Sequence, residues 1–148
     1  MPRPTIEIEA MDWNTEFLPW FSKTWKPGEH VSLIAPTGAG KTTFASGIMG
    51  LRRYVLVLDA KGGDSTLEGL GFPRLAKWPG IKSMSQSVEK NDKENQPSRY
   101  LIGNKSRTNA EQAQLVQTLK KTLDDAYAMG GWTVYADELM ISTDNRQF

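Results

Sequence analysis

Residues 30–49 read HVSLIAPTGAGKTTFASGIM, and this stretch decides the fold. A short apolar run leads into a glycine-rich loop that ends in Gly40-Lys41-Thr42, and a helical segment follows as far as about Gly50. The order of strand, glycine-rich loop, Lys-Thr pair and helix is the Walker A or P-loop pattern. A plain glycine turn does not need the Lys-Thr pair, so the sequence favours a phosphate-binding loop over a simple turn.

Each part of this loop has a physical reason to bind phosphate. The residues expected to contact the nucleotide are Pro36, Thr37, Gly38, Ala39, Gly40, Lys41, Thr42 and Thr43. Small loop residues let backbone N–H groups approach the phosphates, and the helix directs its unpaired N–H groups and positive dipole end at them. Lys41 is expected to reach the β- and γ-phosphates, and the Thr42 hydroxyl to ligate Mg²⁺. Ala35 replaces the usual first glycine, a mild departure at the strand end. The motif predicts binding of ATP with Mg²⁺.

The remaining chain alternates strands with helices. Residues 54–58 (YVLVL) are continuously apolar, which is typical of a parallel strand covered on both faces. Residues 99–103 and 132–136 are two further expected strands, and a long helix is expected from Thr108 or Asn109 to Met129. Its apolar stripe is predicted at Leu115, Val116, Leu119, Leu123, Ala126 and Tyr127. We therefore expect an α/β fold, a P-loop NTPase core whose mostly parallel sheet is flanked by helices.

The 148 residues suit one domain with a single core. Residues 1–27 form an aromatic N-terminal segment, in which Asp12 or Asn14 is expected to cap a short helix. Its rings, at Trp13, Phe17, Trp20, Phe21 and Trp25, recur at helical spacing. We expect them to pack on the core, and the alternative is a surface for adenine or a partner. Residues 64–81 are expected to connect through a short helix, and residues 82–98 to form a polar loop.

Composition excludes several classes of protein. The chain has no cysteine and one histidine, His30, which rules out thiolate metal sites and a multi-histidine metal centre. No apolar run approaches the length of a membrane span, so we expect no membrane partner and a cytoplasmic location. The net charge of +1 carries no signature of nucleic-acid binding.

Residues 134–138 (VYADE) resemble a Walker B box at the end of a strand. Asp137 is expected to hold Mg²⁺, through water, and Glu138 to act as the general base on the attacking water. Alone, the same pattern also suits two exposed acids after an edge strand. The P-loop upstream favours the functional interpretation, because both motifs then reach the carboxyl ends of parallel strands, where ligands bind.

A third motif, residues 59–63 (DAKGG), follows the strand after the P-loop helix. In a doubly wound sheet this loop would lie near the γ-phosphate. An ordinary charged turn is an equally good interpretation of these residues.

Together these motifs resemble the HerA/FtsK-type superfamily of P-loop ATPases, over about residues 28–140. That family commonly has Asp-Pro-Lys where this chain has Asp59-Ala60-Lys61. The resemblance implies a homo-oligomeric ring with ATP at subunit interfaces. It also implies hydrolysis of ATP coupled to translocation of double-stranded DNA, as in phage DNA-packaging ATPases. A phage portal would then be a further partner, and the location would be the host cytoplasm.

The chain departs from this family after Walker B. The family continues to a glycine-arginine region and a strand ending in a sensor glutamine, whereas this sequence stops ten residues after Glu138. We therefore expect an ATPase core that is truncated or split, with a sheet incomplete at its C-terminal end. An arginine finger is expected in trans, and Arg146 is the first choice among the arginines Arg52, Arg53, Arg99, Arg107 and Arg146. The basic residues considered for DNA contact are Lys105, Arg107, Lys120 and Lys121, although neighbouring acids favour an ordinary mixed surface.

Two other functions stay open. A nucleotide kinase would need an arginine-rich lid, and residues 82–98 offer only lysines. A nucleotide-binding module without turnover is the second, because the family's sensor region is missing from this sequence.

Overall fold

The computed structural model describes residues 10–29, 31, 40–60 and 65–137. The chain divides into two compact units, residues 1–34 and 35–148, where the sequence predicted a single domain. The predicted strand before the glycine-rich loop lies outside the described residues, apart from Val31. No helix in the described part of the chain combines the length and apolarity that crossing a bilayer requires.

The first unit contains a short helical segment, a π-helical turn at Trp13–Phe17 that continues into α1 at Leu18–Thr24. The Asp12 carboxylate accepts hydrogen bonds from the backbone N–H groups of Asn14, at 3.1 Å, and Thr15, at 2.8 Å. Asp12 is thus the N-cap, as one of the two sequence alternatives predicted.

The aromatic side chains of this segment stack on one another. The ring centroids of Trp13 and Phe17 lie 5.0 Å apart, those of Phe17 and Phe21 5.4 Å, and those of Phe21 and Trp25 5.2 Å. Because these residues are four apart, their side chains follow one another along one helix face. Packing of this aromatic face on the core stays a prediction.

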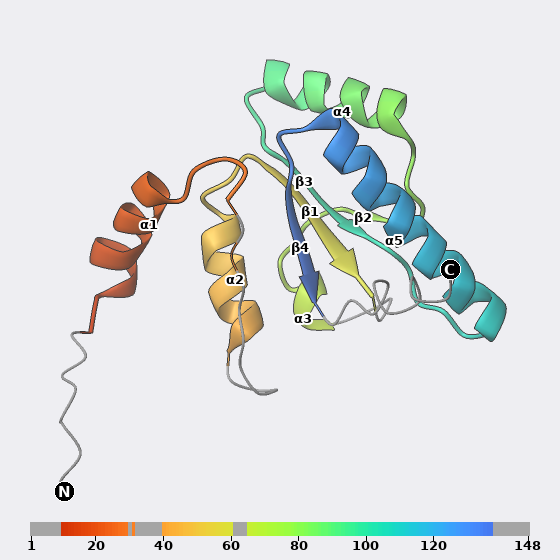
Figure 1. The fold of residues 1–148 in the computed structure, drawn as a ribbon, viewed down its shortest axis with the longest axis horizontal. Coiled ribbons are helices and arrows are strands. Elements are labelled where there is room, and N and C mark those ends of the chain that lie inside the picture. The colour runs from red at the N-terminus through yellow and green to blue at the C-terminus, as the bar shows by residue number, and fades with distance from the viewer. Residues whose placement is uncertain (1–9, 30, 32–39, 61–64, 138–148) are drawn as a thin grey trace, which may run out of the picture. The chain divides into compact units, whose positions relative to one another are not determined.

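The second unit is built on a four-stranded sheet (Figure 1). Its strands are β1 at Tyr54–Asp59, β2 at Arg74–Leu75, β3 at Ser98–Ile102 and β4 at Thr133–Asp137. They lie in the order β2-β3-β1-β4, and every neighbouring pair is parallel. The α/β class and the strands at 54–58, 99–103 and 132–136 are confirmed, with shifts of one residue at some ends.

Among the described residues, three helices connect these strands, α3 at Ser65–Glu68, α4 at Ile81–Lys93 and α5 at Asn109–Met129, and α2 at Lys41–Met49 precedes β1. The crossovers through α4 and α5 run in the same direction across the sheet, so right-handed connections place both helices on one face. Figure 1 shows α4 and α5 together on one side, with α2 on the other. The predicted starts of α2 and α5 are confirmed, and the Thr108 hydroxyl caps α5 by accepting from the Glu111 N–H.

The core forms on both faces of β1. Leu56 and Leu58 pack in one cluster with Ile102 of β3 and with Leu115 and Leu119 of α5. Val55 and Val57 point to the opposite face, because side chains alternate along a strand, and they are equally buried. Burial of each such side chain contributes roughly 1.5–3 kcal/mol. The prediction from the continuous apolar run at residues 54–58, that both faces of this strand are covered, is therefore confirmed.

The predicted polar loop at residues 82–98 is wrong for most of its length, because α4 covers Ile81–Lys93. Sparse apolar residues misled the prediction. They recur at helical spacing at Ile81, Met84 and Val88, and one of them is enough to fix the helix, since Met84 is 1% exposed. Helix-favouring Lys, Gln and Glu residues fill the solvent side.

The predicted stripe of α5 is wrong at Tyr127, which is 92% exposed. The buried face instead runs through Leu119, Thr122 and Ala126, at steps of three and four residues. Asp125 is buried beside it, and its carboxylate accepts a 2.7 Å hydrogen bond from the Trp78 indole N–H. A polar residue was therefore drawn into the core by a partner distant in sequence.

Candidate functional site at the carboxyl edge of the sheet

The glycine that precedes α2 has the backbone geometry of a phosphate-loop end. Gly40 has a φ of +88°, a left-handed conformation that glycine adopts without steric cost. Its carbonyl accepts the Phe44 N–H at 2.9 Å, so the helix begins at Lys41. Lys41 and Thr42 are half-buried and Thr43 is exposed. The N–H groups of this first turn have no carbonyl of their own helix to bind, which makes the turn suited to an anion.

Only part of the predicted nucleotide site falls within the described residues. Pro36, Thr37, Gly38 and Ala39 lie outside them, as do Glu138 and Arg146. Their roles stay predictions.

The ends of β1 and β4 bring the two acidic motifs side by side. In the parallel pairing, Asp59 is the register partner of Asp137, and Leu58 is that of Ala136. Both aspartates thus occupy the last position of adjacent strands at the carboxyl edge. These two residues therefore lie at one edge of the sheet, as the sequence predicted, and their roles in a nucleotide site stay predictions.

The side chain of Asp59 is buried and does not lie in a solvated turn. It is 1% exposed, and its carboxylate accepts a 3.0 Å ion-paired hydrogen bond from the Arg74 guanidinium. Burial of a carboxylate is unfavourable unless it is paired and hydrogen-bonded. Neither sequence interpretation of residues 59–63 anticipated this partner, and Lys61, Gly62 and Gly63 lie outside the described residues.

Arg74 binds three groups at this edge. The same Nη1 that contacts Asp59 also donates to the carbonyl oxygen of Gly103 at 3.0 Å, and Nη2 lies 3.3 Å from a Glu68 carboxylate oxygen. These partners belong to the ends of β1, β3 and α3. Sequence reasoning missed Arg74, because residues 73–75 (PRL) carry neither a motif nor a periodicity that singles it out.

Two of the arginine-finger candidates are engaged at the opposite edge of the sheet. Arg53, directly before β1, donates from Nε to Asp92 at 3.0 Å, and this hydrogen bond raises its pKa. Arg99 donates from Nε and Nη2 to the Arg52 carbonyl, at 3.0 and 2.6 Å. Among the candidates that the structure describes, Arg107 follows the carboxyl end of β3, and it is exposed. Arg53 and Arg99 therefore secure the amino edge and not the edge of the predicted chemistry.

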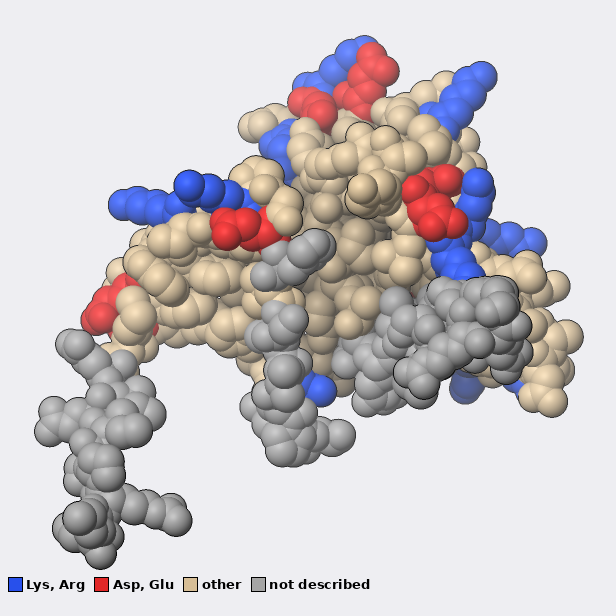
Figure 2. Space-filling model, viewed as in Figure 1, with Lys and Arg blue, Asp and Glu red and all other residues tan. Residues whose placement is uncertain are grey.

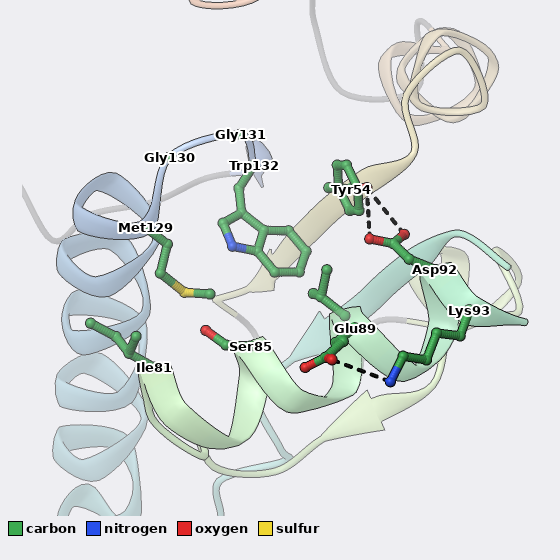
Figure 3. Close-up of a pocket in the computed structure, with 11 residues that line it drawn as sticks. Tyr54, Ile81, Ser85, Glu89, Asp92, Lys93, Met129, Gly130, Gly131 and Trp132 are labelled. Carbon is green, nitrogen blue, oxygen red and sulfur yellow. Dashed lines mark hydrogen bonds and ion pairs between the residues drawn. The ribbon is translucent and has the colours of Figure 1, made fainter. Parts of the chain in front are cut away.

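A pocket of about 690 Å³ also lies at the amino edge (Figure 3). Ile81, Met129 and Trp132 form its apolar walls, and Tyr54 lies at the start of β1. The acidic side chains in it are paired, since Asp92 accepts from the Tyr54 hydroxyl and Glu89 lies 3.3 Å from Lys93. Of the predicted nucleotide and metal residues that the structure describes, none lines this pocket, which lies at the edge opposite Asp59 and Asp137.

The basic residues considered for DNA contact do not gather into one patch. Lys121 pairs with Asp125 at 3.4 Å, and Figure 2 shows acidic groups beside basic ones on the visible face. Lys105 and Arg107 are exposed in the turn that precedes α5. Their surroundings therefore favour the mixed surface that neighbouring acids in the sequence suggested.

The described residues hold no group of three or more His, Cys, Asp or Glu side chains suited to a metal ion. A nucleotide-bound Mg²⁺ does not require one, because phosphate oxygens and water supply most of its ligands. The metal-binding roles of Thr42 and Asp137 stay predictions.

The described residues define an α/β protein with an all-parallel four-stranded sheet, a helix that begins after a left-handed glycine, and two adjacent strands that each end in an aspartate. No family model, curated protein or solved structure matches the chain.

Proposed function

We propose that this chain binds ATP with Mg²⁺ and hydrolyses it, as a subunit of a double-stranded DNA translocase of the kind that packages viral DNA. The observation that carries the proposal is the junction at Gly40, where a left-handed glycine leads directly into a helix that begins Lys41-Thr42. A plain turn explains the glycine but not the Lys-Thr pair at the first helical positions.

The division of labour follows from the residue types. Backbone N–H groups of residues 37–40 and the Lys41 ammonium bind the phosphates. Thr42 and Asp137 would hold Mg²⁺, which would neutralise negative charge on the phosphates. Glu138 accepts a proton from the attacking water. The register of Asp59 with Asp137 supports this assignment, because it puts the end of β4 at the sheet edge where α/β proteins bind ligands.

Binding is tested first, with a fluorescent ATP analogue and Mg²⁺. Lys41→Ala should weaken affinity about 10- to 100-fold, as expected when a charge-assisted hydrogen bond worth about 1.5–3 kcal/mol is lost. Lys93→Ala is the matched control, because Lys93 is exposed on α4 and paired only with Glu89 among the described residues. Equal affinity of Lys41→Ala and the wild type would remove the P-loop assignment.

Turnover is tested next, by phosphate release with and without double-stranded DNA. Glu138→Gln should retain binding and lose about 10²–10⁴-fold in rate, the usual contribution of a general base. Stimulation by DNA supports the translocase. Tight Mg-ATP binding with no hydrolysis would instead indicate a nucleotide-binding module, and phosphate transfer to a nucleotide would indicate a kinase.

A further inference from the structure

Arg74 reaches across the sheet to the end of a strand that is not its neighbour. It is the first residue of β2, which pairs with β3, and β3 in turn separates β2 from β1. Its guanidinium nevertheless binds the carboxylate of Asp59, the last residue of β1. We propose that Arg74 is a positioning residue for hydrolysis: it holds the carboxyl edge of the sheet in the arrangement that the reacting groups require. This inference rests on the proposed ATPase function.

Gly103, directly after β3, makes this reach possible. Its carbonyl accepts from the same Nη1 that binds Asp59. A Cβ at this position would lie 2.9 Å from the Asp59 carbonyl oxygen and 3.6 Å from the Asp59 Cβ. The absence of a side chain therefore lets the ends of β1 and β3 approach closely enough for one guanidinium to bridge them.

The planar guanidinium is matched to this task. It presents donors in a fixed fork, so it serves Asp59, the Gly103 carbonyl and Glu68 at once. A lysine ammonium keeps the charge but cannot match that planar geometry. Asp59 is 1% exposed and Arg74 22%, so water compensates poorly for a contact that is lost.

Positioning matters here because β1 and β4 are coupled. Asp59 is the register partner of Asp137, and the proposed general base is the next residue in the chain. A loosened β1 end would loosen the β4 end that pairs with it. A misplacement of about 1 Å at a reacting group can cost about 100-fold in rate. The contacts of Arg74 are to Asp59, Gly103 and Glu68 and not to α2, so we expect phosphate binding at α2 to persist without it.

The test compares Arg74→Lys with Arg53→Lys in the full chain. Arg53 is a matched control, because it is also ion-paired at 3.0 Å but lies at the opposite edge of the sheet. The measurements are kcat and KM for ATP with DNA present, affinity for the fluorescent ATP analogue, and a thermal melt. Arg74→Lys should lower kcat at least about tenfold and leave affinity within about threefold, the signature of a group that acts on the reaction step. Arg53→Lys should leave both kcat and the affinity for the ATP analogue unchanged.

A folded Arg74→Lys variant with wild-type kcat would overturn the inference, and so would a loss of affinity as large as the loss of kcat. If Arg74→Lys does not fold, Asp59→Asn takes its place, because it retains the side-chain shape and removes the charge that Arg74 binds. The same loss of kcat at unchanged affinity is expected, and wild-type kcat would overturn the inference. A wild-type chain whose nucleotide binding is absent or independent of Lys41 refutes the proposed function instead. A wild type that binds but never hydrolyses ATP refutes its hydrolytic part and this inference with it.

Discussion

Replacement of Gly103 by alanine tests the closest approach at the carboxyl edge of the sheet. Gly103 has a φ of +127°, which L side chains rarely adopt. The added Cβ would lie 2.9 Å from the backbone oxygen of Asp59 and 3.1 Å from a Leu115 methyl group. A backbone oxygen at the end of a buried strand cannot move aside as a flexible side chain could, so both strain and overpacking are expected.

The free energy of unfolding should fall by about 2–5 kcal/mol. Of this, about 1–2 kcal/mol comes from the positive φ, and about 1–3 kcal/mol from overpacking. Gly71→Ala is a control for a positive φ without a close contact, because Gly71 has a φ of +75° and, among the described residues, nothing lies within 4 Å of its added Cβ. That control should lose only the backbone part.

Urea unfolding followed by circular dichroism measures the difference. With a slope of about 1–3 kcal/mol per molar urea, the midpoint of Gly103→Ala should lie about 1 M below that of Gly71→Ala. Equal midpoints for the two variants would refute the reasoning, since the close contact between the ends of β1 and β3 would then have no energetic effect.

Three further predictions concern the core and the N-terminal helix. Leu56→Ala should destabilise the protein by about 2–5 kcal/mol in urea unfolding, because Leu56 is fully buried. Tyr127→Ala is the control and should cost far less, because the Tyr127 side chain is 92% exposed. A similar cost for both variants would contradict the assigned face of α5. Trp78→Phe should cost about 1–3 kcal/mol in the same assay, because it leaves buried Asp125 without its 2.7 Å indole donor; no loss beyond that of an exposed substitution would count against this hydrogen bond. The backbone N–H and the hydroxyl of Thr15 both donate to the Asp12 carboxylate, and these hydrogen bonds lower the pKa of Asp12 below its ordinary value of 3.8. Its contribution to helix stability should therefore be fully present above pH 3.8 and be lost as pH falls through the lowered value, seen as a change in tryptophan fluorescence that Asp12→Asn removes.

Local signals in the sequence were sufficient for much of this fold. The glycine-rich loop and Lys-Thr pair predicted a helix that begins at Lys41, and α2 does begin there. Continuous apolar residues at 54–58 predicted a strand buried on both faces, and β1 is that strand. Such features depend on neighbouring residues, through backbone conformation and side-chain period, and so can be read without knowing what packs where.

The same approach failed where long-range partners decide the outcome. α4 was expected to be a loop, because few apolar residues are visible along it, yet one fully buried methionine at residue 84 anchors it. On α5, Asp125 is inside, where Trp78 from another segment and Lys121 of the same helix pair with its carboxylate, while Tyr127 is outside. A single sequence does not show which distant residues will lie next to each other in the fold.

The sequence by itself determined that a P-loop-like helix start and two acidic strand ends exist, because each is a short motif with its own local chemistry. Only the tertiary structure decided how the strand ends are arranged and what binds the carboxylate of Asp59. The order β2-β3-β1-β4 puts Asp59 in register with Asp137, and it brings Arg74, 15 positions later in the chain, across β3 to neutralise Asp59. That pairing depends on strand order and on the side-chain-free approach at Gly103, which are properties of the assembled sheet and not of any segment within it.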